Sequence, residues 1–444
     1  MRRARGTGDR RGGRDRGGIG SKAGEEKLTS QQTRGLKNKP NSGEGLGRRS
    51  RYGRRPVKGE ADLEKKANGK TESWRRQKLL QIHEALSQDP VDVELLRKAA
   101  QSRGGLLSDQ VRRKVWPRLL GLSPYDLPPH PGRSLLQDHR DYHQVQMDVE
   151  RSLAHFPRGM RPEQRAVLQE QLVAVILAVL SSRPELHYYQ GYHEVALALL
   201  LVLGPRAAAA LLDQLSMHHL RDFMDPTMDN TWHILNYLLP LLARESPQLH
   251  SFMERAEVGT VFALSWLLTW FGHVLPEPTH VLRLMDFFLA SHPLMPVYVA
   301  AAVVLYREPE VLACPCDMPS LHQLLSRLPQ PLPTESLLAQ ALNLFTRHPH
   351  SQLAQETAMR THSSLSIEGS FTALRAASAH QRPDWVLQKQ RQQPGCQKAS
   401  GSQAGPSTLV KAAVWGLSAT LGAAALAVTQ TALGWGPEVL WKIF

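Results

Sequence analysis

The sequence predicts an all-α protein whose helices are joined by turns marked with proline and glycine. Apolar residues recur at the three- and four-residue spacing of helices along most of the chain from Trp74 onward. Almost no segment alternates apolar and polar residues, which is the pattern of a half-buried strand. A multi-helix domain is therefore expected over residues 74–345.

The first helices of this domain have recognisable ends. The first helix is marked at helical spacing by Leu79, Ile82, His83 and Leu86. The second is expected to begin at Asp89-Pro90, an N-cap followed by proline at the first helical position, and to stop at Gly104-Gly105. Ser108 begins the third helix, and Gly121 ends it. The inner face of this third helix is expected to hold Val111, Val115 and Leu119.

The later helices follow in order between proline and glycine breaks. A helix over residues 142–156 is stopped by Pro157, and the helix over 163–180 is apolar on more than one side, which predicts deep burial. A buried helix over 195–203 ends at Gly204-Pro205. Further helices are expected over residues 207–217, 231–244, 259–274, 279–290 and 295–306.

The N-terminal segment, residues 1–73, has a different composition. It carries 21 Lys and Arg against 9 Asp and Glu, a net +12 of the chain's +14, so the remaining residues are close to neutral. Arg-Gly runs with few apolar residues predict disorder. Such a tail contacts RNA or acidic lipid weakly through charge, or is simply solvated without a dedicated partner.

The C-terminal part is expected to be a flexible linker over residues 346–410, with a short helix near residues 371–379. Residues 411–434 are expected to form a transmembrane anchor, followed by a short lumenal tail over 435–444. The anchor contains 22 consecutive uncharged residues, 412–433, and a helix of that length spans about 33 Å, against ~30 Å for a hydrocarbon core. More basic residues precede the anchor than follow it, which predicts a cytosolic domain and a tail-anchored, single-pass protein.

The small residues of the anchor favour a thin membrane such as that of the endoplasmic reticulum (ER). A second apolar stretch, residues 287–306, is interrupted by His292, Pro293 and Pro296 and is expected to be core. No secretory signal peptide is apparent. Three cysteines fit a reducing compartment.

Two short motifs carry candidate chemistry: Val145-x-x-Asp148-x-x-Arg151 and Tyr188-x-Gln190-Gly191. Asp148 and Arg151 share one helix face, so they form either an ordinary surface ion pair or an arginine oriented for insertion elsewhere. Gln190 lies either in an ordinary loop before a helix or in a loop that presents an amide. Taken singly, the first motif favours an ordinary surface ion pair, and the second favours an ordinary loop before a helix.

Together, these motifs resemble those of the TBC domain of Rab GTPase-activating proteins. Two flanking motifs match the same family. The upstream motif holds Arg113 and Trp116 before Leu119-Leu120-Gly121, and the downstream motif runs from Arg283 through Asp286 to Phe288, with Met285 at a tryptophan position. The four motifs lie in order within residues 106–292.

The resemblance implies a dual-finger mechanism. Arg151 would be the arginine finger and Gln190 the glutamine finger, inserted in trans into a Rab GTPase, while Asp148, Tyr188 and Gly191 support them. The chain has no phosphate-binding loop of its own, so GTP and Mg²⁺ come with the partner. In this role the protein is an enzyme activator that supplies catalytic residues.

Further runs, residues 218–230 and 265–275, are similar to an ER-anchored family member that acts in ER-to-Golgi traffic, which implies a Rab of that class and an ER address. Two alternatives remain: a catalytically silent ER scaffold or tether that binds a Rab, and an RNA-associated membrane protein. No metal site is expected, because Asp222, Asp225 and Asp229 fit turns and caps better than a metal cluster.

Overall fold

The computed structural model describes residues 58–125, 127, 137–152, 159–356 and 365–392. The chain divides into two units, residues 1–63 and 64–444, and the helical domain with the four motifs lies in the second. Within the described residues the secondary structure is α-helix with short 3-10 turns and no strand, which confirms the all-α class. The predicted membrane anchor and most of the predicted basic tail lie outside the described residues.

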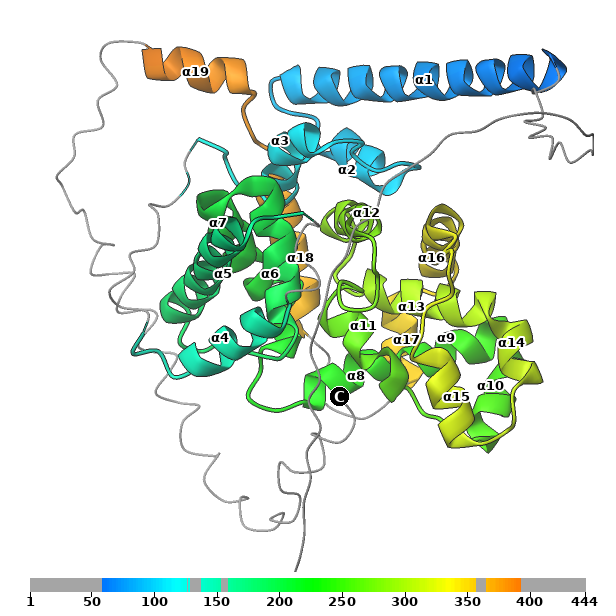
Figure 1. Cartoon of the computed structure of the whole chain (residues 1–444). Helices are drawn as coiled ribbons and strands as arrows, with labels where there is room; N and C mark the ends of the chain where they lie inside the picture. Colours follow the sequence, from blue (N-terminus) through cyan, green and yellow to red (C-terminus); the bar gives the residue numbers. More distant parts are fainter. Residues whose placement is uncertain (1–57, 126, 128–136, 153–158, 357–364, 393–444) are drawn as a thin grey trace, which may run out of the picture. The chain divides into compact units, whose positions relative to one another are not determined.

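The helices follow one another closely along the chain (Figure 1). They are α1 (Lys58–Ser87), α2 (Val93–Gln101), α3 (Asp109–Leu119), α4 (Tyr142–Arg151), α5 (Pro162–Ser182), α6 (Tyr192–Leu203), α7 (Pro205–Met217), η2 (Arg221–Phe223), α8 (Asp229–Asn236), α9 (Leu238–Glu245), α10 (Pro247–Arg255), η3 (Val261–Ala263), α11 (Leu264–Leu268), α12 (Pro278–Leu289), α13 (Met295–Tyr306), α14 (Glu308–Ala313), α15 (Met318–Leu325), α16 (Thr334–Arg347), α17 (His350–Glu356), α18 (Leu365–Ser378) and α19 (Asp384–Gln392).

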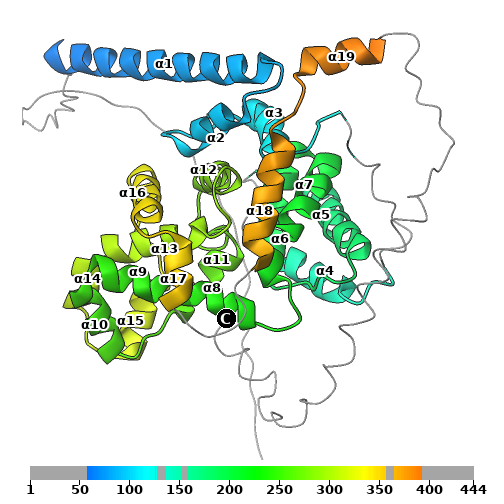
Figure 2. The same ribbon diagram turned by 180° about the vertical axis from the view of Figure 1, so that it is seen from behind.

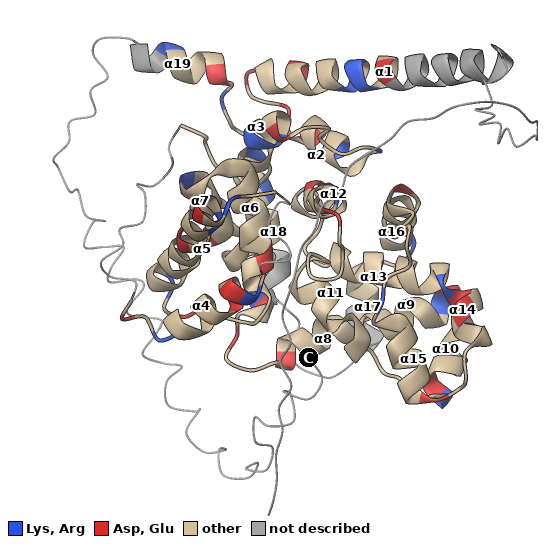
Figure 3. Ribbon diagram, viewed as in Figure 1, with Lys and Arg blue, Asp and Glu red and all other residues tan. Residues whose placement is uncertain are grey.

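Two groups of helices form the domain (Figures 1 and 2). Helices α4, α5, α6 and α7 pack on one another, and α9, α10, α13 and α16 form the second group. Helix α12 contacts α2, α3 and α6. Helix α13 is buried from Met295 to Val304, and neither it nor α11 carries a charged residue (Figure 3). The apolar stretch 287–306 is therefore core, as predicted.

The N-cap of α2 corrects one prediction. Asp92, and not Asp89, caps this helix: its Oδ1 accepts a hydrogen bond from the Leu95 amide at 2.8 Å. Asp92 lies between Val91 and Val93, both buried, so core packing decides which aspartate reaches the capping position. In contrast, Ser108 caps α3 as predicted, accepting from the Val111 amide at 3.4 Å.

Two predicted helices are shorter than the apolar pattern indicates. The segment 231–244 forms two helices, α8 and α9, that meet at Tyr237. Pro240 has no amide to donate and its ring opposes the carbonyl of residue 236, so the helix cannot continue through this point. The segment 259–274 is helical only through Leu268, because Trp270 and Phe271 have positive φ values of 49° and 64°. Both aromatic side chains are buried, so packing holds this turn.

Helices α4 and α5 lie where the sequence predicts them, but α5 is less buried than expected. Helix α4 is Tyr142–Arg151, and residues 153–156 of its predicted span lie outside the described residues. Helix α5 matches its predicted span, but only its second half is buried, and Val167 in its first half is 51% exposed. By length and composition α5 is also apolar enough to cross a membrane, a property shared by core helices.

The segment expected to be a flexible linker, residues 346–410, holds three helices up to residue 392: α17, α18 and α19. Leu374 of α18 is buried, and the Val91 amide donates to the Gln381 carbonyl at 2.8 Å. Arg118 of α3 donates to the Arg382 carbonyl and to Asp384. The structure thus differs from the linker prediction, because these segments pack on the domain. It also differs in placing the start of α1 at Lys58, inside the predicted disordered tail.

Candidate functional site

The two short motifs meet in space through Asp148 and Tyr188. Asp148 lies in the last turn of α4, and Tyr188 lies in the loop that precedes α6. The Tyr188 hydroxyl donates to Asp148 Oδ2 at 3.0 Å, and the Gln144 side-chain amide donates to Oδ1 at 3.1 Å. Asp148 is 2% exposed. Its carboxylate is therefore a fixed, buried link between the motifs.

Arg151 is the last residue of α4. Its Nη1 lies 3.7 Å from Asp148 Oδ1, while 54% of its side chain stays exposed. A cation at the helix C-terminus also interacts favourably with the helix dipole. Arg151 thus pairs with Asp148 and is also exposed to solvent. The motif can therefore be both an ordinary surface ion pair and an arginine oriented for insertion into another molecule.

Gln190 is exposed at the end of a loop that is fixed on both sides. Upstream, the His187 amide donates to the Met224 carbonyl at 2.9 Å. Next to Gln190, the buried Tyr189 donates through its hydroxyl to the Leu268 carbonyl at 3.1 Å. The loop is therefore held at its base while the Gln190 amide faces solvent.

Gly191 is required directly after Gln190 for two reasons. Its φ of +106° lies in the region that favours glycine. In addition, a Cβ at this position would lie 2.8 Å from Thr269 Cγ2, well inside van der Waals contact. The close approach of residues 268–269 thus fixes both the glycine and the direction in which Gln190 projects.

Burial and the negative charge of Asp148 raise the pKa of Tyr188 well above its ordinary value. The hydroxyl therefore stays protonated and acts as a donor to Asp148. The same oxygen lies 3.1 Å from His193 Nδ1, and His193 Nε2 lies 3.5 Å from Glu194 Oε1. A chain of buried polar groups thus continues from Asp148 into the first turn of α6.

Trp116 and Asp286 belong to a different cluster, which joins α3 to α12. The Trp116 indole donates to Asp286 Oδ1 at 2.8 Å, and both side chains are fully buried. Arg112 donates to both carboxylate oxygens of Asp286 at 3.0 Å. Arg112 is absent from the predicted site residues, although it lies one helical turn before Trp116 on the same face and could have been found by that spacing.

Arg283 and Arg113 also hold the domain together. Arg283 donates to the carbonyls of Ala100, Gln101 and Ser102 at the end of α2 and pairs with Glu335 at 2.8 Å. Arg113 donates to the Val202 carbonyl near the end of α6 at 2.6 Å. These contacts join framework helices and lie outside the two short motifs.

The aspartates after α7 form turn contacts. Asp225 accepts from the Asn230 amide at 2.6 Å and pairs with Arg221, and Asp229 accepts from Thr227 at 2.8 Å. In the part of the chain that the structure describes, no group of three or more His, Cys, Asp and Glu side chains is placed to hold a metal ion.

Comparisons with known proteins identify the family to which the chain is similar. A family model described as the Rab-GTPase-TBC domain matches residues 109–312. Human TBC1 domain family member 20 is 53% identical over 374 residues, covering 83% of this chain and 93% of the relative. The GTPase-activating protein gyp10 of Schizosaccharomyces pombe is 35% identical over 266 residues, covering 59% and 71%.

Among solved structures, the crystal structure of the Ypt/Rab-GAP domain of Gyp1p is similar with a TM-score of 0.52 at 16% identity. The match covers 61% of this chain and 98% of that domain. At this identity the similarity establishes a shared fold. The match to the relatives extends over most of their lengths, so the likeness is not limited to the four motifs.

Proposed function

The chain belongs to the Rab-GTPase-TBC domain family, and we propose that its Arg151 and Gln190 act as arginine and glutamine fingers on a Rab GTPase of ER-to-Golgi traffic. As a Rab GTPase-activating protein, it takes a GTP-bound Rab as its partner. It contributes side chains in trans, and GTP and Mg²⁺ come with the Rab.

The observation that supports the proposal is the exposure of two suitable side chains on bases that are tied together. Arg151 is 54% exposed and Gln190 is exposed, while the Asp148–Tyr188 hydrogen bond of 3.0 Å links α4 to the loop before α6. By contrast, Arg283, which joins framework helices, has its guanidinium bonded to a backbone carbonyl and to Glu335 within the domain. Side chains that are exposed on a fixed base are suited to a reaction in a partner's site.

Each finger has a distinct chemical task. Hydrolysis of GTP spreads negative charge over the γ-phosphoryl oxygens and needs a water in line with the leaving group. The planar, permanently charged guanidinium of Arg151 suits the stabilisation of this charge. The amide of Gln190 both accepts and donates hydrogen bonds, so it can orient the attacking water.

Asp148, Tyr188 and Gly191 are positioning residues in this mechanism. Asp148 limits the directions available to Arg151 through the ion pair at 3.7 Å. Tyr188 fixes Asp148, and Gly191 permits the backbone turn that presents Gln190. Prior fixation of both fingers lowers the entropy that is lost when they enter the GTPase site.

The test uses Arg151→Ala and Gln190→Ala in a GTP-hydrolysis assay with a panel of Rab GTPases. Arginine fingers contribute roughly 10³–10⁵ in rate, which is about 4–7 kcal/mol of barrier. We expect Arg151→Ala to lose most of its stimulation without loss of folding stability, because the side chain is half exposed. Arg347→Ala is the matched control, since Arg347 is 50% exposed and also forms one ion pair.

Stimulation by Arg151→Ala at the wild-type rate would exclude the finger assignment. If the wild-type chain bound GTP-loaded Rabs but stimulated none of them, the scaffold alternative would be correct. The Rab whose GTP is hydrolysed fastest in the panel identifies the substrate and decides the proposed ER-to-Golgi class.

The proposed address is the ER membrane, with the catalytic domain in the cytosol. The support is the uncharged stretch 412–433 and the basic residues that precede it. Residues 405–444 fused to a soluble reporter are expected to direct it to the ER membrane. A reporter that stayed soluble would contradict this part of the proposal while leaving the finger mechanism intact.

A further inference from the structure

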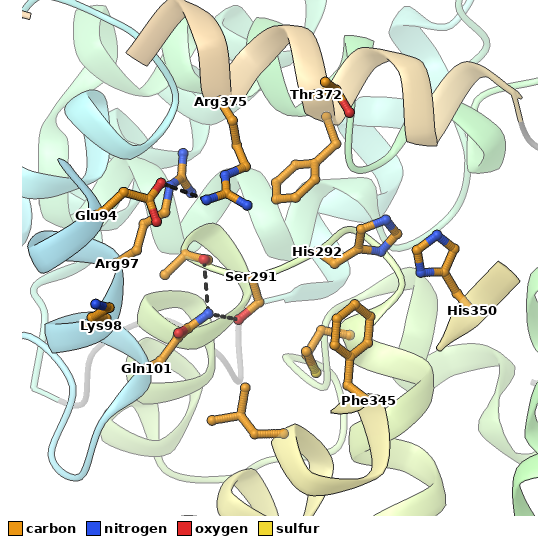
Figure 4. Close-up of a pocket in the computed structure, with 14 residues that line it drawn as sticks. Glu94, Arg97, Lys98, Gln101, Ser291, His292, Phe345, His350, Thr372 and Arg375 are labelled. Atoms are coloured by element: carbon orange, nitrogen blue, oxygen red, sulfur yellow. Dashed lines mark hydrogen bonds and ion pairs between the residues drawn. The ribbon is translucent and has the colours of Figure 1, made fainter. Parts of the chain in front are cut away.

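A cavity of about 650 Å³ lies between α2, the turn after α12, α16, α17 and α18 (Figure 4). It is built from elements other than α4 and the loop before α6, so it is distinct from the proposed finger site. Its volume is in the range of sites for small organic ligands. Its lining separates into a charged end and an aromatic end.

The charged end is predominantly basic. Arg97 and Lys98 come from α2, and Arg375 comes from α18 (Figure 4). Among the described residues that line the cavity, Glu94 is the one carboxylate, and it lies 2.8 Å from Arg375 Nη2 and 3.6 Å from Arg97 Nε. The three cations and one anion of this described lining give the charged end a formal charge of +2.

Arg97 is the most informative group in this lining. It is 4% exposed, and its Nη2 donates to the Leu119 carbonyl at 2.7 Å. Its Nε and Nη1 are buried without a hydrogen-bond acceptor among the described residues. Burial, partly offset by Glu94, lowers the pKa of Arg97 to about 10, so the group remains charged near neutral pH. Buried donors are normally paired with an acceptor, and a ligand in this cavity can supply one.

The other end of the cavity is apolar and aromatic (Figure 4). His292 and His350 stack with ring centroids 4.3 Å apart, and Phe345 lies against both. Phe371 of α18 closes this end, with its ring 5.2 Å from that of His292. Burial and the neighbouring His350 lower the pKa of His292 to about 3, so His292 adds no charge at neutral pH.

We propose that this cavity binds a phosphate ester whose phosphate contacts Arg97, Lys98 and Arg375 and whose apolar body lies against Phe345 and Phe371. A phosphate monoester carries a charge of about −1.5 to −2 near neutral pH, which matches the +2 of the charged end. Its oxygens provide the acceptors that Arg97 lacks, and guanidinium groups bind phosphate with favourable geometry. The ligand is either the headgroup region of an anionic phospholipid or a soluble phosphate ester.

The test measures binding of dihexanoyl phosphatidic acid to the full chain in non-ionic detergent by titration calorimetry. Dihexanoyl phosphatidylcholine, inorganic phosphate and hexanoate serve as comparison probes. We expect phosphatidic acid to bind and the other three to bind at least tenfold more weakly. Equal binding of hexanoate would overturn the phosphate assignment, and equal binding of phosphatidylcholine, a zwitterionic phosphate diester, would overturn the match between the charged end and a phosphate monoester. Equal binding of inorganic phosphate would overturn the role of the apolar end.

Two substitutions at the same ion pair separate binding from structure. Arg375→Gln removes a cation that contacts the phosphate, so we expect affinity to fall about tenfold or more, the effect of losing one charge-assisted hydrogen bond. Glu94→Gln removes the competing carboxylate, so we expect affinity to rise. A purely structural ion pair would respond in the same direction to both substitutions, and that result would overturn the proposal.

Arg347→Gln is the matched control, because Arg347 is also half exposed and pairs with Glu245 at 2.7 Å. Neither residue of this pair lines the cavity. It is expected to leave binding unchanged, and an equal loss would show that only net charge matters. Flotation with phosphatidylcholine vesicles, with and without phosphatidic acid, identifies the source of the ligand. Flotation that needs phosphatidic acid and is weakened by Arg375→Gln assigns a lipid, and soluble binding without such flotation assigns a free ester.

Discussion

The hydrogen bond between Tyr188 and Asp148 joins the two motifs that carry the proposed fingers, so Tyr188→Phe tests whether this link positions Arg151 and Gln190. The substitution removes one oxygen and keeps the aromatic ring. Asp148 is 2% exposed and would lose the donor that now lies 3.0 Å from its Oδ2. A hydrogen bond to a charged group contributes about 1.5–3 kcal/mol, so we expect a stability loss of that size.

The effect of Tyr188→Phe on the stimulated rate is expected to be smaller than the effect of removing either proposed finger. Asp148 keeps Gln144 and its ion pair with Arg151 at 3.7 Å, so Arg151 remains partly oriented. The loop that carries Gln190 loses its hydrogen bond to α4. We expect the Rab-stimulated kcat/KM to fall roughly tenfold, or about 1.4 kcal/mol of activation free energy, against a loss of roughly 10³ or more for Arg151→Ala.

The assay compares stimulated GTP hydrolysis with urea unfolding on the same preparations. Tyr298→Phe is the control, because the Tyr298 hydroxyl donates to the His348 carbonyl at 2.7 Å and touches neither motif. It is expected to cost about 1 kcal/mol of stability and to leave the stimulated rate unchanged. If Tyr188→Phe were folded and retained the wild-type rate, the Asp148–Tyr188 link would have no positioning role.

Three further substitutions test the supporting contacts. Gly191→Ala places a Cβ 2.8 Å from Thr269 Cγ2 at a positive φ, and we expect a stability loss of about 2 kcal/mol or more together with a lower stimulated rate; wild-type activity and stability would contradict the close approach. Asp286→Ala leaves the buried Arg112 and the Trp116 indole without their shared acceptor, so the free energy of unfolding in urea is expected to fall by about 3–5 kcal/mol. A fall below about 1 kcal/mol would show that these buried donors find other acceptors. Burial raises the pKa of Glu335, but its hydrogen bond and ion pair with Arg283 outweigh burial and lower the pKa overall. The stabilisation by Glu335 is therefore complete above the unfolded-state pKa of 4.5 and is lost as pH falls through the lower folded-state pKa. In urea unfolding, the destabilisation caused by Glu335→Gln is expected to shrink from pH 7 toward acid, and a destabilisation that did not change with pH would contradict the pairing.

The elements that could be predicted are those with strong local signals. Helix α13 runs from Met295 to Tyr306, the predicted span, because twelve uncharged and mostly apolar residues lie after a proline-marked turn. The Ser108 cap of α3 was also predicted, since a serine side chain satisfies an amide three residues later in the chain. Local chemistry decides such features, and one chain is sufficient to find them.

Other features depended on contacts between distant segments. Asp92 became the cap of α2 because Val91 and Val93 are buried and because the Val91 amide meets the Gln381 carbonyl. The turn at Trp270 and Phe271 has positive φ at two aromatic residues, and no sequence rule predicts that conformation. Packing therefore overrode local preference at these positions.

The same division applies to the candidate site. The sequence by itself determined the residue types at Arg151 and Gln190 and their family resemblance, since these follow from motif and spacing. Only the tertiary structure decided that the Tyr188 hydroxyl bonds Asp148, that Arg112 shares Asp286 with Trp116, and that α18 closes a basic cavity on α2. The physical reason is that the spacing of residues along a helix decides which side chains share one face of that helix. Which other helix packs against that face depends on how the whole core is buried.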